Sequence, residues 1–114
     1  MRILFDKNVL VGVRTFLTSH GVRTISELGW PDQLENCELL SRAEISGFEL
    51  LVTSDQNIRY QQNLAGRKMG LVILGSNIWP IVRIYGAAIS AAVDAAKPGI
   101  YLFVEMPLPS KPRL

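Results

Sequence analysis

The chain is short of the features that mark secreted and membrane proteins. Cys37 is the only cysteine among its 114 residues, which excludes an internal disulfide and favours a reducing, cytoplasmic compartment. No apolar run approaches the roughly 18 residues of a membrane span, so we expect no contact with a membrane. The first residues pass straight from Ile3-Leu4-Phe5 to a charge, and we therefore expect no signal peptide.

An excess of either charge is also missing. Twelve Lys and Arg against ten Asp and Glu give a net charge of +2, which permits contact with nucleic acid without arguing for it. Hydrophobic residues make up 48% and charged residues 19% of the chain, a composition typical of a globular protein. The length suits one domain, which we expect over residues 1–105, followed by a proline-rich tail over 106–114.

Strand and helix patterns alternate along the chain. Short apolar runs predict five strands, at residues 2–5, 22–25, 49–53, 70–74 and 100–104. Apolar stripes at helical spacing predict helices that begin near Asn8, Asn36 and Pro80, and a shorter polar helix is expected over 58–64. This alternation predicts a three-layer α/β/α fold with a mainly parallel five-stranded sheet and right-handed crossovers.

Polar residues follow the predicted strands where each strand ends. Asp6 and Asn8 follow the first strand, Ser54 and Asp55 the third, and Ser76-Asn77 the fourth. Ligands of open parallel sheets bind outside these carboxyl ends. Clustered carboxylates persist where a cation neutralises them, and oxygen ligands favour Mg²⁺ or Mn²⁺ over zinc. A hydrated ion of this kind can polarise a phosphate and supply hydroxide.

The same residues have a plainer interpretation. Asp and Asn directly after a strand are ordinary helix caps, and Asp6, Asn8, Asp55 and Asn57 all stand where caps are expected. Spacing alone therefore favours caps over a metal site.

Several short segments resemble a family of small, mostly uncharacterised PIN-like proteins that are often described as toxin components of toxin–antitoxin pairs. The segments occur in the family's order and, with looser similarity around the fifth strand, extend over nearly all of the chain except its tail. The Tyr-Gln-Gln-Asn-Leu block within the last of them is the most distinctive. They are Ile3-Leu4-Phe5-Asp6-x-Asn8, Glu27-Leu28-Gly29-Trp30, Asn36-x-Glu38-Leu39-Leu40, Leu51-Val52-Thr53-Ser54-Asp55-Gln56-Asn57 and Arg59-Tyr60-Gln61-Gln62-Asn63-Leu64.

The resemblance implies a PIN-like sheet with a Mg²⁺- or Mn²⁺-dependent ribonuclease centre. Its catalytic and metal-binding acids would be Asp6, Glu38 and Asp55, with Asn77 as a fourth, weaker ligand. RNA is the implied substrate, and a cognate antitoxin is the implied protein partner; we also expect a homodimer. The residues expected to line the site are Asn8, Asn36, Gln56 and Asn57.

Two positions depart from the family's pattern. The family usually has Asp-Glu-Asn where this chain has Asp6-Lys7-Asn8, and many relatives carry an acid where Asn36 stands. Lys7 either points away from the pocket, because neighbours on a strand exit alternate in direction, or pairs with Asp6 and Asp55 in place of the cation. The second arrangement would weaken metal binding.

Basic and aromatic residues offer a second candidate surface. Arg59, Tyr60, Arg67 and Lys68 are candidates for contact with an RNA backbone and a stacked base, and a solvated helix face is the plainer interpretation. Trp79 is expected either to anchor a loop or to contribute to a dimer surface. Two functions from different classes follow: a metal-dependent ribonuclease, and a catalytically degenerate PIN-like module that binds a protein or RNA.

Overall fold

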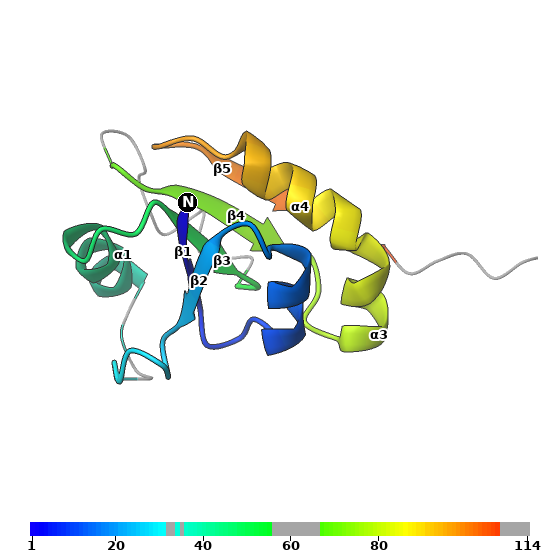
Figure 1. The fold of residues 1–114 in the computed structure, drawn as a ribbon, viewed down its shortest axis with the longest axis horizontal. Coiled ribbons are helices and arrows are strands. Elements are labelled where there is room, and N and C mark those ends of the chain that lie inside the picture. The colour runs from blue at the N-terminus through cyan, green and yellow to red at the C-terminus, as the bar shows by residue number, and fades with distance from the viewer. Residues whose placement is uncertain (32–33, 35, 56–66, 108–114) are drawn as a thin grey trace, which may run out of the picture.

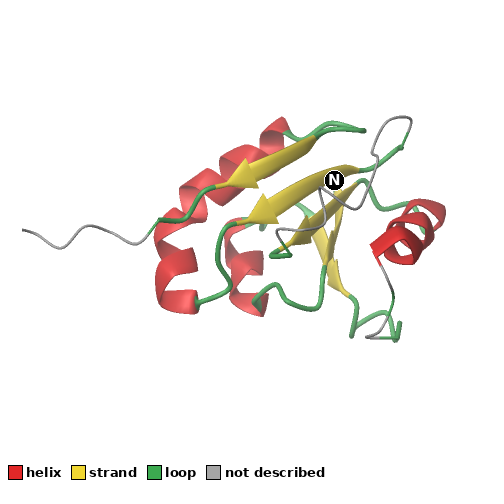
Figure 2. Cartoon of the chain, turned by 180° about the vertical axis from the view of Figure 1, so that it is seen from behind, coloured by secondary structure: helices red, strands yellow, loops and turns green. Residues whose placement is uncertain are grey.

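The computed structural model describes residues 1–31, 34, 36–55 and 67–107, which form one sheet with helices packed on it (Figures 1 and 2). The strands are β1 (Arg2–Phe5), β2 (Gly21–Thr24), β3 (Leu50–Thr53), β4 (Gly70–Leu74) and β5 (Tyr101–Val104). The helical elements are the 3-10 helix η1 (Val11–Phe16), α1 (Asn36–Ile45), α3 (Trp79–Val82), the 3-10 helix η2 (Arg83–Tyr85) and α4 (Gly86–Ala95).

The five strands lie in the order β2-β1-β3-β4-β5, and every neighbouring pair is parallel. The prediction of an α/β fold with a mainly parallel sheet is therefore confirmed. Each predicted strand agrees with the observed one to within one residue at either end. The central strands β3 and β4 are buried along their whole length, as continuous apolar runs predict for strands covered on both faces.

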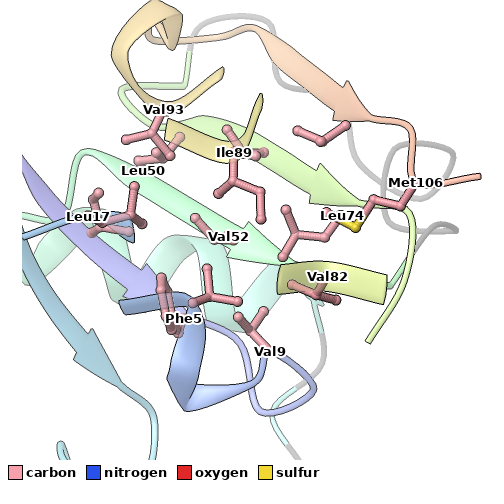
Figure 3. Packing of buried hydrophobic residues seen from close by; sticks show 14 residues of the cluster. Phe5, Val9, Leu17, Leu50, Val52, Leu74, Val82, Ile89, Val93 and Met106 are labelled. Atoms are coloured by element: carbon pink, nitrogen blue, oxygen red, sulfur yellow. The ribbon is translucent and has the colours of Figure 1, made fainter. Parts of the chain in front are cut away.

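Side chains that alternate along the strands build one core on each face of the sheet. Phe5, Val52 and Leu74 point to the face that η1, α3 and α4 cover (Figure 3). Leu4 and Leu51 point to the opposite face, where they pack with Leu39 and Leu40 of α1 and their neighbours. The sheet thus forms the middle of three layers.

The first helix differs from its prediction. The stripe of apolar residues predicts an α-helix capped by Asn8, but the chain forms the 3-10 helix η1, which Leu10 precedes without a side-chain cap. The first turn of η1 contains Val11, Gly12 and Val13, and all three are poor α-helix formers. The Thr15 hydroxyl also donates to the Gly12 carbonyl at 2.7 Å, a local bond that competes with helical pairing. Asn8 is therefore not a helix cap.

The expectation of right-handed crossovers throughout is wrong. The β1–η1–β2 and β4–α4–β5 connections leave in opposite directions along the sheet, yet both place their helices on the same face. Two parallel crossovers with this arrangement have opposite hands, so only one of them follows the usual right-handed rule. Because both connections cross the same face, η1 and α4 lie side by side (Figures 1 and 2).

The C-terminal third begins as predicted and then deviates. Pro80 lies in the first turn of α3, where its missing N–H costs nothing, but the predicted single helix is interrupted by η2. The start of the predicted tail belongs to the domain: Met106 is buried, and the Tyr85 hydroxyl donates to the Pro107 carbonyl at 2.5 Å. The predicted helix over 58–64 and the rest of the tail lie outside the described residues.

Within the described part of the chain, none of the helices has both the length and the apolar character needed to cross a bilayer.

Candidate functional site

The strand order creates one place where connections diverge. From β1 the chain crosses through η1 to β2 on one side, and it later returns through α1 to β3 on the other side of β1. In doubly wound sheets with the order 2-1-3-4-5, this switch point opens a crevice beyond the carboxyl ends of the two diverging strands. Asp6 and Asp55 both lie at this edge, one after β1 and the other after β3.

Asp6 is held firmly at this edge. Its backbone N–H donates to the Val52 carbonyl at 2.9 Å, which extends the pairing of β1 and β3 by one residue. Its residue surface is only 7% exposed. One carboxylate oxygen accepts the Lys7 backbone N–H at 2.8 Å, and the other accepts the Thr53 hydroxyl at 2.8 Å. These bonds satisfy a buried carboxylate and fix its orientation.

Thr53 and Asn8 connect the two strand exits. The buried Thr53 hydroxyl donates to Asp6 and accepts the Asp55 backbone N–H at 3.1 Å. The Asn8 side-chain carbonyl accepts the Ser54 backbone N–H at 3.0 Å. Asn8 therefore positions the loop after β3, and this role replaces its interpretation as a helix cap.

The network reaches a third strand exit through serines. The Ser54 hydroxyl lies 3.5 Å from the Ser76 carbonyl, and the Ser76 hydroxyl accepts the Ile78 backbone N–H at 3.1 Å. Asn77, the predicted fourth ligand, follows Ser76 and is exposed. The loops after β1, β3 and β4 are thus linked at one edge of the sheet.

Glu38 is placed differently from the two aspartates. It lies exposed in the first turn of α1, whose inner face is formed by Leu39, Leu40 and Ala43. Across the described part of the chain, no three or more His, Cys, Asp or Glu side chains gather closely enough to hold a metal ion. The three-acid ligand set implied by the resemblance therefore stays a prediction.

Lys7 and Asp6 follow the alternation expected at a strand exit. Asp6 is buried, whereas the next residue, Lys7, is exposed. Both predicted arrangements of the Lys7 side chain stay predictions, because exposure alone does not distinguish them.

The other predicted residues have mixed outcomes. Arg67 donates to Glu44 of α1 at 2.8 Å, and this ion pair ties the segment before β4 to α1. Lys68 is exposed. Asn36 begins α1, and only its backbone is described. Four of the predicted residues lie outside the described part of the chain, namely Gln56, Asn57, Arg59 and Tyr60.

One segment that carries the family resemblance supports the fold rather than the site. Glu27 and Thr24 exchange hydrogen bonds between side chain and backbone in both directions, and Gly29 adopts a positive φ of 71°. Two hydrogen bonds hold the pKa of the Glu27 carboxyl below its usual value. The larger effect comes from the Arg14 guanidinium and the smaller from the Thr24 backbone N–H. The turn ends at Trp30, which packs edge-on against Phe48.

Three contributors to the network were not predicted as site residues: Thr53, Ser54 and Ser76. Thr53 closes the otherwise apolar run Leu50-Leu51-Val52, and a buried hydroxyl at a strand end must find a partner. That was the available signal in the sequence. The two serines stand at the strand exits already recognised, but nothing in their spacing predicts a bond between them.

The residues present meet the modest demands of magnesium. Mg²⁺ is usually bound by one or two carboxylates together with water and substrate phosphates. An ionised carboxylate has about four lone-pair positions, and the two bonds to Asp6 leave part of this capacity for a cation. The donor set is all oxygen, the chemistry that Mg²⁺ and Mn²⁺ prefer.

Comparison of the chain with protein-family models, with curated proteins and with solved structures found no match in any of the three.

Proposed function

We propose that this chain is a PIN-like ribonuclease that depends on Mg²⁺ or Mn²⁺, with its centre at the carboxyl edge of β1 and β3. The observation that carries the proposal is the buried carboxylate of Asp6 at the switch point, which accepts two hydrogen bonds. The Thr53 hydroxyl connects this carboxylate to the Asp55 backbone. A carboxylate fixed in this way is preorganised, so little ordering remains when a cation binds.

Each residue has a defined part in this proposal. Asp6 holds the cation rigidly, and Asp55 adds a second carboxylate from the neighbouring strand exit. Glu38, in the first turn of α1, is the third acid that the resemblance implies. A bound ion would polarise the scissile phosphate and would lower the pKa of its water. The resemblance adds a biological setting, in which a cognate antitoxin restrains the nuclease.

A second function is favoured by two specific observations. The described acids do not form a three-membered cluster, and a lysine stands where the family usually has a glutamate. Both fit a degenerate PIN-like module that binds RNA or a protein without cleaving it.

Metal binding and cleavage measured on the same variants distinguish the two functions. Calorimetric titration with Mn²⁺ should show binding to the wild type and its loss in Asp6→Asn and Asp55→Asn, with cleavage of single-stranded RNA lost in parallel. Asp94→Asn makes the same chemical change at an exposed carboxylate on α4 and should leave both activities intact. Absence of binding at millimolar Mn²⁺ contradicts the ribonuclease and leaves the binding module.

A further inference from the structure

Trp79 is a large aromatic side chain that is ordered without being buried. It stands at the start of α3 and is 39% exposed. Its ring stacks on Phe16 of η1, with 6.0 Å between the ring centroids and 17° between the planes. It also lies against Gly12, where an added Cβ would come within 2.7 Å of the indole. The indole therefore has a fixed orientation and keeps part of its surface open to solvent.

The residues that hold Trp79 in place belong to chain segments that also form the candidate site. Ser76, three residues before Trp79, is the residue that bonds the loop after β4 to Ser54. Gly12 lies in the first turn of η1, the element that follows Asp6 and the β1 exit. Trp79 is thus held by the chain segments that leave β1 and β4, two of the three strands whose exits build the site.

A positively charged residue follows Trp79 at a distance of one helical turn. Arg83 follows Trp79 by four residues, the spacing that places two side chains on one face of a helix. It is exposed, and no ion pair joins it to any residue that the structure describes. Lys7 lies exposed at the same edge of the sheet, after β1. The exposed charge of Arg83 is complementary to a phosphate.

We propose that Trp79 and Arg83 form a subsite for an unpaired nucleotide of single-stranded RNA, next to the Asp6 site. The exposed indole stacks on the base, and Arg83 contacts a neighbouring phosphate. In its choice of RNA as ligand, the subsite rests on the proposed function. It gives that function a means of holding the substrate that does not require the cation.

A second copy of the chain fits this surface less well. A specific protein interface buries about 800 Å² on each partner, with few charges at its centre. Here the exposed large apolar residues on the segments around Trp79 are Val11, Ile78 and Ile84. The exposed polar residues Asn77 and Arg83 stand next to the two isoleucines in the chain. A small apolar platform flanked by a cation suits one nucleotide better than a subunit.

Fluorescence and anisotropy test the subsite without any cleavage. In a Trp30→Phe background Trp79 is the only tryptophan, and adding a short single-stranded oligoribonucleotide in EDTA should quench its emission saturably. Inorganic polyphosphate, which has no bases, should not quench it. With fluorescein-labelled RNA, Trp79→Leu should bind about ten-fold more weakly and Trp79→Phe nearly as tightly as the parent.

The arginine has a matched control. Arg83→Gln should weaken RNA binding about three-fold and reduce the salt dependence by about one phosphate contact. Arg23→Gln removes an exposed arginine from β2, the edge strand farthest from β4, and should change neither.

The outcomes separate this inference from the proposed function. Unchanged RNA affinity in Trp79→Leu overturns the subsite, even where Mn²⁺-dependent cleavage is observed. Quenching and a ten-fold loss in Trp79→Leu support the subsite even where no cleavage occurs, and only the nuclease proposal then fails. If sedimentation shows that Trp79→Leu dissociates a dimer while RNA affinity is unchanged, the surface joins two copies and the subsite is overturned.

Discussion

At the scale of single residues, Thr53 is central to the candidate site. Its hydroxyl donates a hydrogen bond to the Asp6 carboxylate and accepts one from the Asp55 backbone N–H. One oxygen therefore links the two strand exits. Because Thr53 is fully buried, water cannot replace either bond when the hydroxyl is removed.

Thr53→Val keeps the shape of the side chain and removes both bonds. We expect the free energy of unfolding to fall by about 1–3 kcal/mol, the cost of leaving buried polar groups without their partner. Urea denaturation followed by circular dichroism measures this change. Thr53→Ser keeps the hydroxyl and should recover most of the bonding, although it loses a methyl group.

A matched control lies in η1. The exposed Thr15 hydroxyl donates only to Gly12 within its own helix, so Thr15→Val should alter the free energy of unfolding by no more than about 0.5 kcal/mol. An equal loss in both variants would contradict a special role for Thr53.

The two aspartates could be placed from the sequence, but their bonding could not. Parallel strands bring their carboxyl ends to one edge, so Asp6 and Asp55 were predicted there from strand boundaries alone. The cap interpretation of Asn8 was wrong because the helix begins three residues later, at Val11. Asn8 instead bonds to Ser54, 46 residues away in the chain, a partner that no local pattern indicates.

At the scale of elements, β4 and the turn before β5 approach unusually closely. A Cβ added at Gly70 would lie 2.7 Å from the Lys97 carbonyl oxygen and 3.4 Å from that of Ile100. Both atoms belong to the backbone, which cannot move aside as a flexible side chain can. Gly70 is therefore required where the chain enters β4.

We expect Gly70→Ala to lower the free energy of unfolding by about 1–3 kcal/mol, the usual cost of overpacking. Gly21→Ala is the control at the start of β2, where the nearest atom to an added Cβ is the Met1 carbonyl oxygen at 3.9 Å. It should be neutral or slightly stabilising. Thermal unfolding of both variants checks the difference, and equal melting temperatures would contradict it.

Strands were more predictable than helices for a physical reason. A short, continuously apolar run such as Leu50-Leu51-Val52 is stable only when both faces of the strand are covered, so the bounds of the strand follow from its composition. The form of a helix depends on smaller differences. Apolar spacing predicted the position of η1, but it could not indicate that the chain there forms a 3-10 helix, which Gly12 and the local Thr15 bond favour.

At the scale of the whole molecule, two cores share one sheet. The same strands contribute alternate side chains to both cores. If one core loses its packing, the strands that the other core needs are therefore disturbed as well. Trp30 packs against the core on the α1 face, and Trp79 stacks on Phe16, which packs against the core on the other face.

The chain should therefore unfold in one step. In each single-tryptophan variant, Trp30→Phe and Trp79→Phe, the urea midpoint from fluorescence should coincide with the midpoint from circular dichroism. A fluorescence midpoint that departs from the circular dichroism midpoint in either variant would show that the two cores unfold separately.

The hand of the last crossover could not be predicted, because the general rule favours the opposite arrangement. The contact between η1 and α4 is close: an added Cβ at Gly86, the first residue of α4, would lie 2.6 Å from the Phe16 ring. The His20 ring and the Asp94 carboxylate also meet across this contact at 3.2 Å.

The side-by-side packing of η1 and α4 has a consequence for how the protein is made. These helices are separated by three strands and about 70 residues of chain, so η1 leaves the ribosome long before α4 is available to pack against it. Val13 and Leu17 share their core with Ile89 and Val93 of α4, so their packing is complete only after α4 has been synthesised. The nascent chain thus carries an apolar surface through most of its translation, and such surfaces are the ones that chaperones bind.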